Sequence, residues 1–351
     1  MKRTLCIFIL VCTGFSCSID SSRSVLSDFD NTINLKLNVS PIESTELGEL
    51  LDMVCFDSIL IINEVFEEQI FKYFNVTNGN LGSNFVNRGK GPNELIFPGL
   101  MCALDDSIFS TYEANKKQLV YFNVHDIIAN FHQFEKTIDT NLSDLIIFQS
   151  YPLNDSLIIF TGIFEDGKYC LYNSLSENMI ITVEFPDDEN HQEENNFIKS
   201  MAHQGEIAIK PDKRKFVFVC RNGYFDICSV SQNELFLENR KLYHLSDYKV
   251  IGDNVVAHSS KSAYAFHSVE ATNSYIYMIY SGRTQDEFGS EYVAGNNILV
   301  YDWNGNPVVN FKTDRYLHRM TLDGKNLIIY GYCINSVTGE PEIVTCQLPK
   351  H

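Results

Sequence analysis

Apolar residues along this chain fall in short runs that are separated by polar turns. The runs KFVFVC at 215–220 and YIYMIY at 275–280 are rich in Val, Ile, Tyr and Phe, which favour β-strands over helices. In residues 43–53 the leucines fall on one helical face, and there we expect a short helix. The pattern therefore predicts an all-β chain with little helix, and it argues against an α-solenoid.

A repeated pattern divides the chain into units of similar length. The pair Asp-Ser, followed by two apolar residues, begins at Asp57, Asp106 and Asp155, so consecutive copies are 49 residues apart. Short polar side chains at such a pair bond back to the backbone and favour a turn between two strands. Six units of this kind predict a six-bladed β-propeller, with insertions in loops at its rim. The weaker copies begin at Asp212, Thr272 and Asp323.

The two ends of the chain predict how the ring closes. The sixth unit offers three apolar strands, at 317–322, 326–333 and 342–348, so one strand is missing. Residues 33–39 alternate apolar and polar positions and have no neighbouring strand of their own. We therefore expect this N-terminal strand to close the last blade beside 342–348, which places a single propeller at residues 33–349.

The first residues are typical of an export signal. Lys2 and Arg3 precede an apolar run at 5–12 that is too short to span a bilayer, and Ser16 directly precedes Cys17. We interpret residues 1–16 as a signal peptide and Cys17 as a lipidated N-terminus, followed by a flexible tether at 17–32. The alternative is a plain signal peptide cut elsewhere. The expected location is the bacterial cell envelope, as an outer-membrane lipoprotein that faces the periplasm or the cell surface and touches the membrane through its lipid only.

Charge and cysteine content narrow the choice of partners. The chain has 27 basic and 45 acidic residues, a net charge of −18, which argues against nucleic-acid binding. Seven of the ten cysteines lie beyond the leader, in no CxxC pattern, so we expect no metal centre and no cofactor. Most of these cysteines fall in apolar runs, as small buried residues do. The alternative is that two of them form one disulfide.

Two motifs carry a resemblance to a known family. Residues 89–95 (GKGPNEL) are close to a G-x-G-P-G-E-F segment, and residues 298–307 (ILVYDWNGNP) are close to a hairpin ending in Gly-Asn-Pro. In these segments the chain resembles the TolB-like and NHL-like six-bladed propeller lipoproteins of gut-type Gram-negative bacteria, over about residues 41–349. The resemblance implies a propeller in the envelope and no established chemistry.

Local catalytic motifs give little support to an enzyme. The segment RGKGPNE at 88–94 lacks the Ser or Thr and the first glycine of a phosphate-binding loop, so we interpret it as a turn between blades. The acidic run at 187–194 lacks the spacing of an EF-hand and is typical of a solvated loop. Neither Gly-x-Ser-x-Gly nor HExxH occurs.

A ligand of a propeller is expected on the axis, where loops from several blades meet. By repeat register we predict a ligand-binding set in which basic residues attract an anionic or polyhydroxyl ligand. The alternative is a scatter of exposed charges on unrelated loops. The predicted set is Glu64, Arg88, Lys90, Glu113, Arg221, Arg283 and Tyr332.

These observations favour a non-catalytic binding or scaffold module for an envelope protein, peptide or glycan. Two other hypotheses stay open. One is an envelope enzyme, lyase-like or lactonase-like, with a polar axial site that holds a divalent ion, because propellers can assemble catalytic groups from several blades. The other is a structural spacer without a concave pocket.

Overall fold

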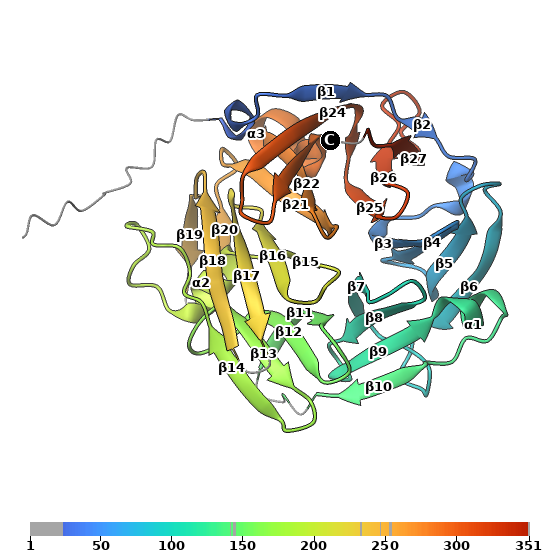
Figure 1. Ribbon diagram of the computed structural model, residues 1–351, viewed down its shortest axis with the longest axis horizontal. Helices are drawn as coiled ribbons and strands as arrows, with labels where there is room; N and C mark the ends of the chain where they lie inside the picture. The colour runs from blue at the N-terminus through green and yellow to red at the C-terminus, as the bar shows by residue number, and fades with distance from the viewer. Residues whose placement is uncertain are drawn as a thin grey trace, which may run out of the picture.

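The computed structural model describes residues 24–349 except 141, 143–144, 232–233, 246 and 253–254. These residues form the predicted all-β fold, with six sheets arranged in a ring around a central axis (Figure 1). The signal peptide expected at 1–16 and the lipidation site expected at Cys17 lie outside the described residues. Among the described residues, no helix has the length and apolar character that a membrane span requires.

Four consecutive antiparallel strands make each of the first four blades, and the first strand of each lies nearest the axis. Along each strand, apolar residues either alternate with polar ones or follow one another without a break, because each blade packs between two others and buries both faces. From the inner to the outer strand, the four blades are β3 (Leu50–Phe56), β4 (Ile59–Glu64), β5 (Gln69–Asn75), β6 (Leu81–Asn87); β7 (Pro98–Ala103), β8 (Ile108–Glu113), β9 (Gln118–Asn123), β10 (Lys136–Asp139); β11 (Ile146–Pro152), β12 (Leu157–Ile163), β13 (Tyr169–Asn173), β14 (Asn178–Thr182); and β15 (Gly205–Ile209), β16 (Lys215–Cys220), β17 (Tyr224–Ser231), β18 (Glu234–Leu242).

The last two blades each take their outermost strand from the N-terminal segment. Blade five has five strands and blade six has four. They are β21 (Ala263–Ala271), β22 (Tyr275–Thr284), β23 (Gly295–Asp302), β24 (Pro307–Leu317) with β1 (Thr32–Leu35), and β25 (Arg319–Asp323), β26 (Ile328–Ile334), β27 (Pro341–Gln347) with β2 (Asn38–Val39).

Closure of the ring is confirmed, but it uses a shorter strand than predicted. Asn38 and Val39 pair with β27 in antiparallel fashion and complete blade six. The first half of the predicted strand instead pairs in parallel with β24, the outer strand of blade five. The chain changes blades at Leu37, whose N–H donates a hydrogen bond of 2.9 Å to Asp314 Oδ1 and so leaves the first ladder.

Two other expectations about the N-terminal region differ from the structure. The helix expected at 43–53 is reduced to a 3₁₀ turn, η2 (Ser44–Glu46), because the leucines that follow enter the inner strand β3. The tether expected at 17–32 ends earlier, since η1 (Val25–Asp28) is already folded. Val25 is buried, and Phe29 packs edge-on against Tyr301 with 5.2 Å between ring centroids.

The Asp-Ser motif of the first three blades and its weaker copies in the other three lie at the same place, the hairpin between the two inner strands. The side chain that closes the turn precedes the motif in two blades: Asp105 Oδ1 accepts from Ser107 N at 2.8 Å, and Asn154 Oδ1 accepts from Ser156 N at 3.0 Å. Asp212 and Asp323 make the same bond themselves. All six hairpins therefore lie on one face of the ring.

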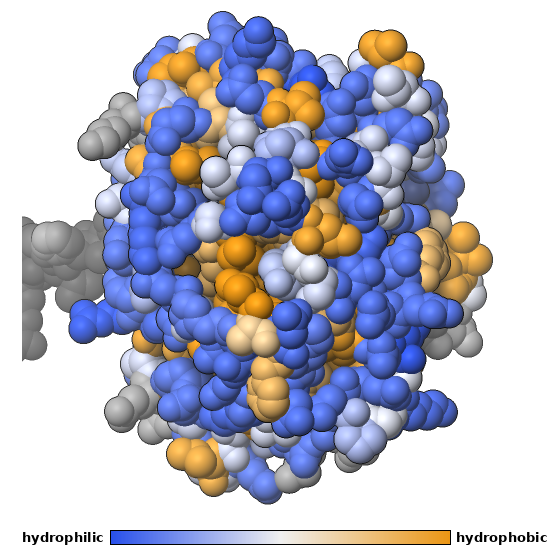
Figure 2. All heavy atoms as spheres, turned by 90° about the vertical axis from the view of Figure 1, so that its right-hand side faces the viewer, coloured by the Kyte–Doolittle hydropathy of each residue, from blue (hydrophilic) through white to orange (hydrophobic). Residues whose placement is uncertain are grey.

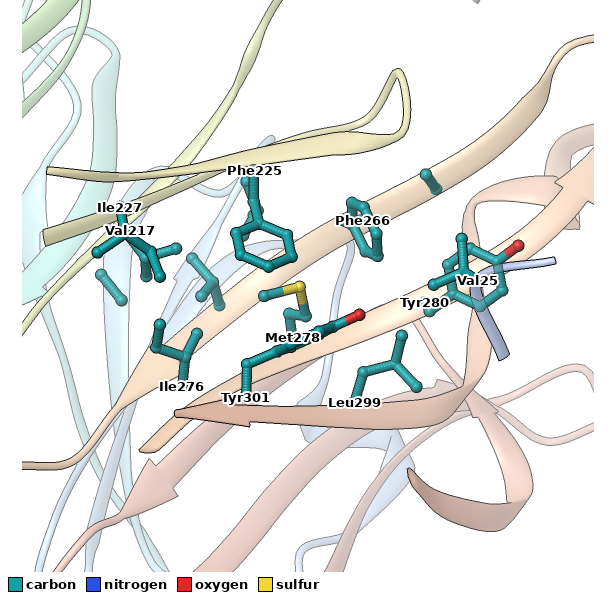
Figure 3. Packing of buried hydrophobic residues seen from close by; sticks show 14 of the residues in the cluster. Val25, Val217, Phe225, Ile227, Phe266, Ile276, Met278, Tyr280, Leu299 and Tyr301 are labelled. Carbon is teal, nitrogen blue, oxygen red and sulfur yellow. The ribbon is translucent and has the colours of Figure 1, made fainter. Parts of the chain in front are cut away.

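Hydrophobic clusters fill the space between neighbouring blades. The cluster between blades four and five contains Phe225, Phe266, Met278 and Tyr301 and is joined by Val25 from the N-terminal segment (Figure 3). Equivalent clusters lie between all other neighbouring blades, including blades six and one. Burial of apolar surface contributes about 25 cal/mol per Å², which makes these contacts the main source of stability.

The rim carrying blades one and two is mostly hydrophilic, with apolar side chains in scattered patches (Figure 2).

Insertions carry the remaining elements. Helix α1 (Val124–Ile128) lies between the outer strands of blade two, and α3 (Gln285–Phe288) and η3 (Gly289–Val293) lie between β22 and β23. Helix α2 (Asn196–Ala202) joins blades three and four, and the hairpin of β19 (Tyr248–Ile251) and β20 (Val255–His258) joins blades four and five. Ile198 and Ala202 of α2 pack on Tyr248 of this hairpin, so the two insertions form one unit.

Candidate functional site

Two pockets lie on the axis, lined by the inner strands, and they share Leu100 and Glu206. The hairpin-side pocket, about 610 Å³, is lined by the Asp-Ser hairpins of several blades, including Asp57, Asp106 and Gly324. The loop-side pocket, about 470 Å³, lies at the opposite ends of the inner strands and is lined in part by α2. A concave site on the axis, as the sequence predicted for a binding module, is therefore present.

Charged side chains lie between the two pockets. Arg319 Nη1 lies 2.6 Å from Glu206 Oε2, which also accepts from Ser268 N at 3.2 Å. Burial acts to raise the pKa of Glu206, but the charge and hydrogen bond of Arg319 lower this pKa below its ordinary value. Burial raises the pKa of Asp52 to about 6 and that of Glu270 to about 8, so Glu270 is largely protonated at neutral pH.

Arg221 is the cation of the loop-side pocket that has no ion-pair partner within 4 Å among the described residues, and its charge helps to lower the pKa of Glu206 from a greater distance. Its Nη2 donates to Gln204 Oε1 at 2.6 Å, and within the described part of the chain no carboxylate lies within 4 Å of its guanidinium. The other two cations lining the pocket are compensated, Arg319 by Glu206 and Lys168 by Asp226. An uncompensated guanidinium in a pocket is suited to bind an anion.

Three buried polar atoms of the same pocket have no hydrogen-bond partner. They are Thr161 Oγ1 on β12, Ser200 Oγ on α2, and Nδ1 of His203, which follows α2. These residues are 6%, 3% and 5% exposed, so ordinary solvent contact does not satisfy them. Burial, followed by the charge of Lys168, lowers the pKa of His203 to about 3, so the ring is neutral. Other buried polar atoms without a partner lie elsewhere in the fold, and these three are the ones whose residues line this pocket, where a ligand or ordered water can supply the missing hydrogen bonds.

One wall of the pocket is fixed by a buried ion-pair network. Asp226 accepts from Lys168 Nζ at 3.0 Å, Arg240 Nε at 2.7 Å and the Tyr169 hydroxyl at 2.8 Å. Lys168 Nζ also lies 3.7 Å from the centroid of the Phe218 ring. Burial lowers the pKa of Lys168 against the opposing effect of Asp226. These contacts hold Lys168 in place and balance its charge.

Two of the predicted carboxylates have structural partners. Glu64 accepts from Gly48 N at 2.6 Å and pairs with Lys72 Nζ at 2.6 Å. Glu113 is fully buried and accepts from the backbone N–H groups of Ile96 and Phe97 at 2.7 and 2.8 Å. Each carboxylate caps the loop that enters the inner strand of a blade, and neither lines the two axial pockets.

Four more predicted residues also lie away from the axial pockets. Arg88 donates to the carbonyl oxygens of Val65, Glu67 and Ile96, and the Tyr332 hydroxyl donates to Gly48 O at 3.1 Å. Arg283 lies between the rings of Phe288 and Tyr316, with its Cζ 3.9 and 4.4 Å from their centroids. Lys90 is exposed and lines a separate surface pocket beside blade two.

Of the seven predicted residues, Arg221 lines the loop-side pocket. The structure does not bring the set together, and a ligand role for the other six stays a prediction. Sequence reasoning missed Thr161, Ser200 and His203. Thr161 is inside a strand, and Ser200 and His203 belong to an insertion that was expected at the rim. The length of that insertion was the one feature of the sequence that could have pointed to these residues. Among the described residues, no group of three or more metal-binding side chains lies close together.

The cysteines remain without disulfide bonds. All seven cysteines among the described residues are free, and four of them are buried. Burial raises the pKa of each thiol listed here, so these side chains act as small apolar groups: Cys170, Cys220, Cys228 and Cys333.

Comparison with known proteins supports the fold. A family model described as TolB-like 6-blade propeller-like matches residues 33–325. A member of the DUF4221 family from Bacteroides vulgatus ATCC 8482 is similar in structure, with a TM-score of 0.58 and 9% identity over 90% of this chain and 96% of that chain. The β-propeller domain of Cps50 (Swd1) from Myceliophteria thermophila gives a TM-score of 0.46 and 8% identity over 89% of this chain and all of that one. No curated protein sequence matches significantly.

Proposed function

Because this chain belongs to the TolB-like six-bladed propeller family, we propose that it is a non-catalytic binding protein of the bacterial envelope, anchored by a lipid on Cys17. Its ligand, part of an envelope protein, peptide or glycan, occupies the loop-side pocket. The fold supplies a rigid ring in which loops of several blades meet at one concave site.

The observation that carries this proposal is the set of unpartnered polar atoms in the loop-side pocket. Thr161, Ser200 and His203 are each more than nine-tenths buried and each present an atom without a partner. A buried polar group without a hydrogen bond costs about 1–3 kcal/mol. A bound ligand that supplies the missing bonds relieves this cost.

Ion pairing in the pocket favours recognition over proton transfer. Lys168 Nζ lies 3.0 Å from Asp226 Oδ2. Arg319 Nη1 lies 2.6 Å from Glu206 Oε2. His203 is neutral because its pKa is lowered to about 3, first by burial and then by the charge of Lys168. The enzyme hypothesis predicts instead that a captured ligand is converted when it is incubated with the protein.

A plugged pocket tests the proposal. A Cβ at Gly99 meets only ordinary contacts, 3.6 Å to Tyr112 O and 3.8 Å to Phe148 O, so Gly99→Trp places an indole at the loop-side pocket. Gly324→Trp is the matched control at the hairpin-side pocket, where a Cβ lies 3.6 Å from Thr272 Cγ2. Both variants and the wild type are used for recovery from detergent-solubilised envelopes and for glycan arrays.

We expect the wild type and Gly324→Trp to retain the same partner or glycan and Gly99→Trp to lose it. Equal retention by all three proteins would place binding elsewhere. Recovery of every protein alone, with no glycan retained, contradicts the proposal.

The anchor is tested separately by labelling cells with radioactive palmitate. Label on the wild type but not on Cys17→Ala supports lipidation. An unlabelled wild type rules out the anchor and leaves the binding pocket unaffected.

A further inference from the structure

The loop-side pocket is lined by Arg221, which has no carboxylate within 4 Å among the described residues, and by three residues that each carry a buried polar atom without a partner. We propose that its ligand is an acidic sugar, with the carboxylate on Arg221 and hydroxyl groups on Thr161, Ser200 and His203. This inference rests on the proposed function, because it assigns a ligand class to the same pocket.

The charge balance of the pocket points to a single carboxylate. Arg319 and Lys168 are paired with Glu206 and Asp226, whereas the guanidinium of Arg221 donates to the neutral amide of Gln204 and acts on Glu206 only from beyond 4 Å. A guanidinium offers a planar pair of N–H donors that matches the two oxygens of a carboxylate. The protein as a whole is strongly acidic, with a net charge of −18, so an anion is attracted only where such a local cation is free.

The unpartnered atoms favour hydroxyl groups on the rest of the ligand. Thr161 Oγ1 and Ser200 Oγ can each donate or accept, and Nδ1 of neutral His203 does either, depending on its tautomer. A hydroxyl group also donates and accepts, so one sugar can satisfy all three atoms in several orientations. A peptide amide has a fixed donor and a fixed acceptor and therefore matches this mixed set less well.

Aromatic rings and size agree with a short saccharide. Phe185, Phe218 and Tyr264 line the pocket and offer apolar surface to the C–H face of a sugar ring. The volume of about 470 Å³ lies in the lower half of the range for small-molecule sites, about 300–1,000 Å³. One or two sugar units fit such a site better than a folded protein surface.

Isothermal titration of the purified protein with three small ligands tests the inference. D-glucuronate has the carboxylate and the hydroxyls, D-glucose has only the hydroxyls, and N-acetyl-trialanine has a carboxylate with amides. We expect glucuronate to bind at least about 10-fold more tightly than either of the others, because only it satisfies Arg221 and the polar wall together.

Variants assign the contacts. Arg221→Gln is expected to weaken glucuronate binding about 10- to 100-fold, the usual effect of losing a charged hydrogen bond. Arg214→Gln, an exposed arginine on the opposite face with the same change of charge, is expected to bind like the wild type. Ser200→Ala and Thr161→Val are each expected to weaken binding about 5-fold. If Arg221→Gln fails to fold, Arg221→Lys keeps the charge, loses the planar fork and is expected to bind more weakly than the wild type.

If the ligands bind, three results would overturn the inference. They are equal affinity for glucuronate and glucose, wild-type affinity in folded Arg221 variants, and a preference for the acetylated peptide. The last result leaves the proposed function standing, because a ligand still occupies the pocket. If none of the three ligands binds, the acidic-sugar inference falls, and the Gly99→Trp experiment alone decides the proposed function.

Discussion

Arg319 on β25 and Glu206 on β15 form an ion pair of 2.6 Å that joins the sixth blade to the fourth and bypasses the fifth. Each side chain is less than one-fifth exposed. Removal of one partner leaves the charge of the other at the axial pockets without its counter-charge. We expect Glu206→Gln to lower the free energy of unfolding by about 3 kcal/mol, measured by urea denaturation.

The control for this prediction is an exposed ion pair. Lys136 and Asp155 are 3.5 Å apart, and Asp155 is fully exposed. Asp155→Asn should change the free energy of unfolding by less than about 1 kcal/mol. Equal effects of the two substitutions would mean that the axial pair contributes no more than a surface contact.

Glu270, in the hairpin-side pocket, makes stability depend on pH. Burial raises its pKa from 4.5 to about 8 in the folded protein. The folded state then holds a proton that the unfolded state releases, so stability falls as pH rises from about 4.5 to about 8. We expect Glu270→Gln to raise the melting temperature at pH 8 and to leave it nearly unchanged at pH 4.5. Glu43→Gln, an exposed carboxylate, is the control, and a parallel pH profile for wild type and Glu270→Gln would contradict the prediction.

The N-terminal segment contributes to the core between blades four and five. Phe29 is 8% exposed and packs on Tyr301, and the neighbouring Asp28 accepts from the Tyr243 hydroxyl at 3.0 Å. Phe29→Ala is expected to lower the free energy of unfolding by about 3 kcal/mol through lost burial and a cavity. Phe66→Ala, at a phenylalanine that is 80% exposed, should have little effect in the same chemical denaturation series. A similar loss of unfolding free energy in Phe29→Ala and Phe66→Ala would contradict a contribution of Phe29 to the core.

Glu113 is expected to act on folding rather than on ligand affinity. Its carboxylate accepts from Ile96 N and Phe97 N and from both the backbone and the side chain of Asn115. Glu113→Ala leaves these donors unpaired and should lower the free energy of unfolding by about 2–4 kcal/mol. The control is Glu135→Ala, at an exposed glutamate of the same blade. The stability of both variants is measured by thermal melting. Wild-type stability with impaired ligand binding would return Glu113 to the binding site.

The fold could be predicted because its determinants are local in sequence. A turn such as that at Asp106 and Ser107 occurs at intervals of 49 residues in the first three blades and in weaker form in the others, and each turn needs only neighbouring residues to form. The partner of an N-terminal strand is less local. Alternation over residues 33–39 marks a half-buried strand but cannot show which sheet it joins, and here the chain joins two.

The site could be predicted only in part, because register places a residue but not its neighbours. Glu64, Glu113 and Arg221 all follow or end the second strand of a blade. At Glu64 and Glu113 the loop that enters the inner strand of the same blade supplies N–H donors, whereas Arg221 faces the insertion that carries α2. The conformation of those loops decides which side chain stays free, and no spacing in the sequence encodes it.

At the N-terminal end of the described residues, Val25 packs into the cluster between blades four and five. Strand β1 lies at the rim of the ring, against blade five (Figure 1). If Cys17 carries the lipid, only seven residues separate it from Val25, a reach of about 30 Å at full extension. The attachment point is then at the rim and not on either face of the ring. Both axial openings lie away from it.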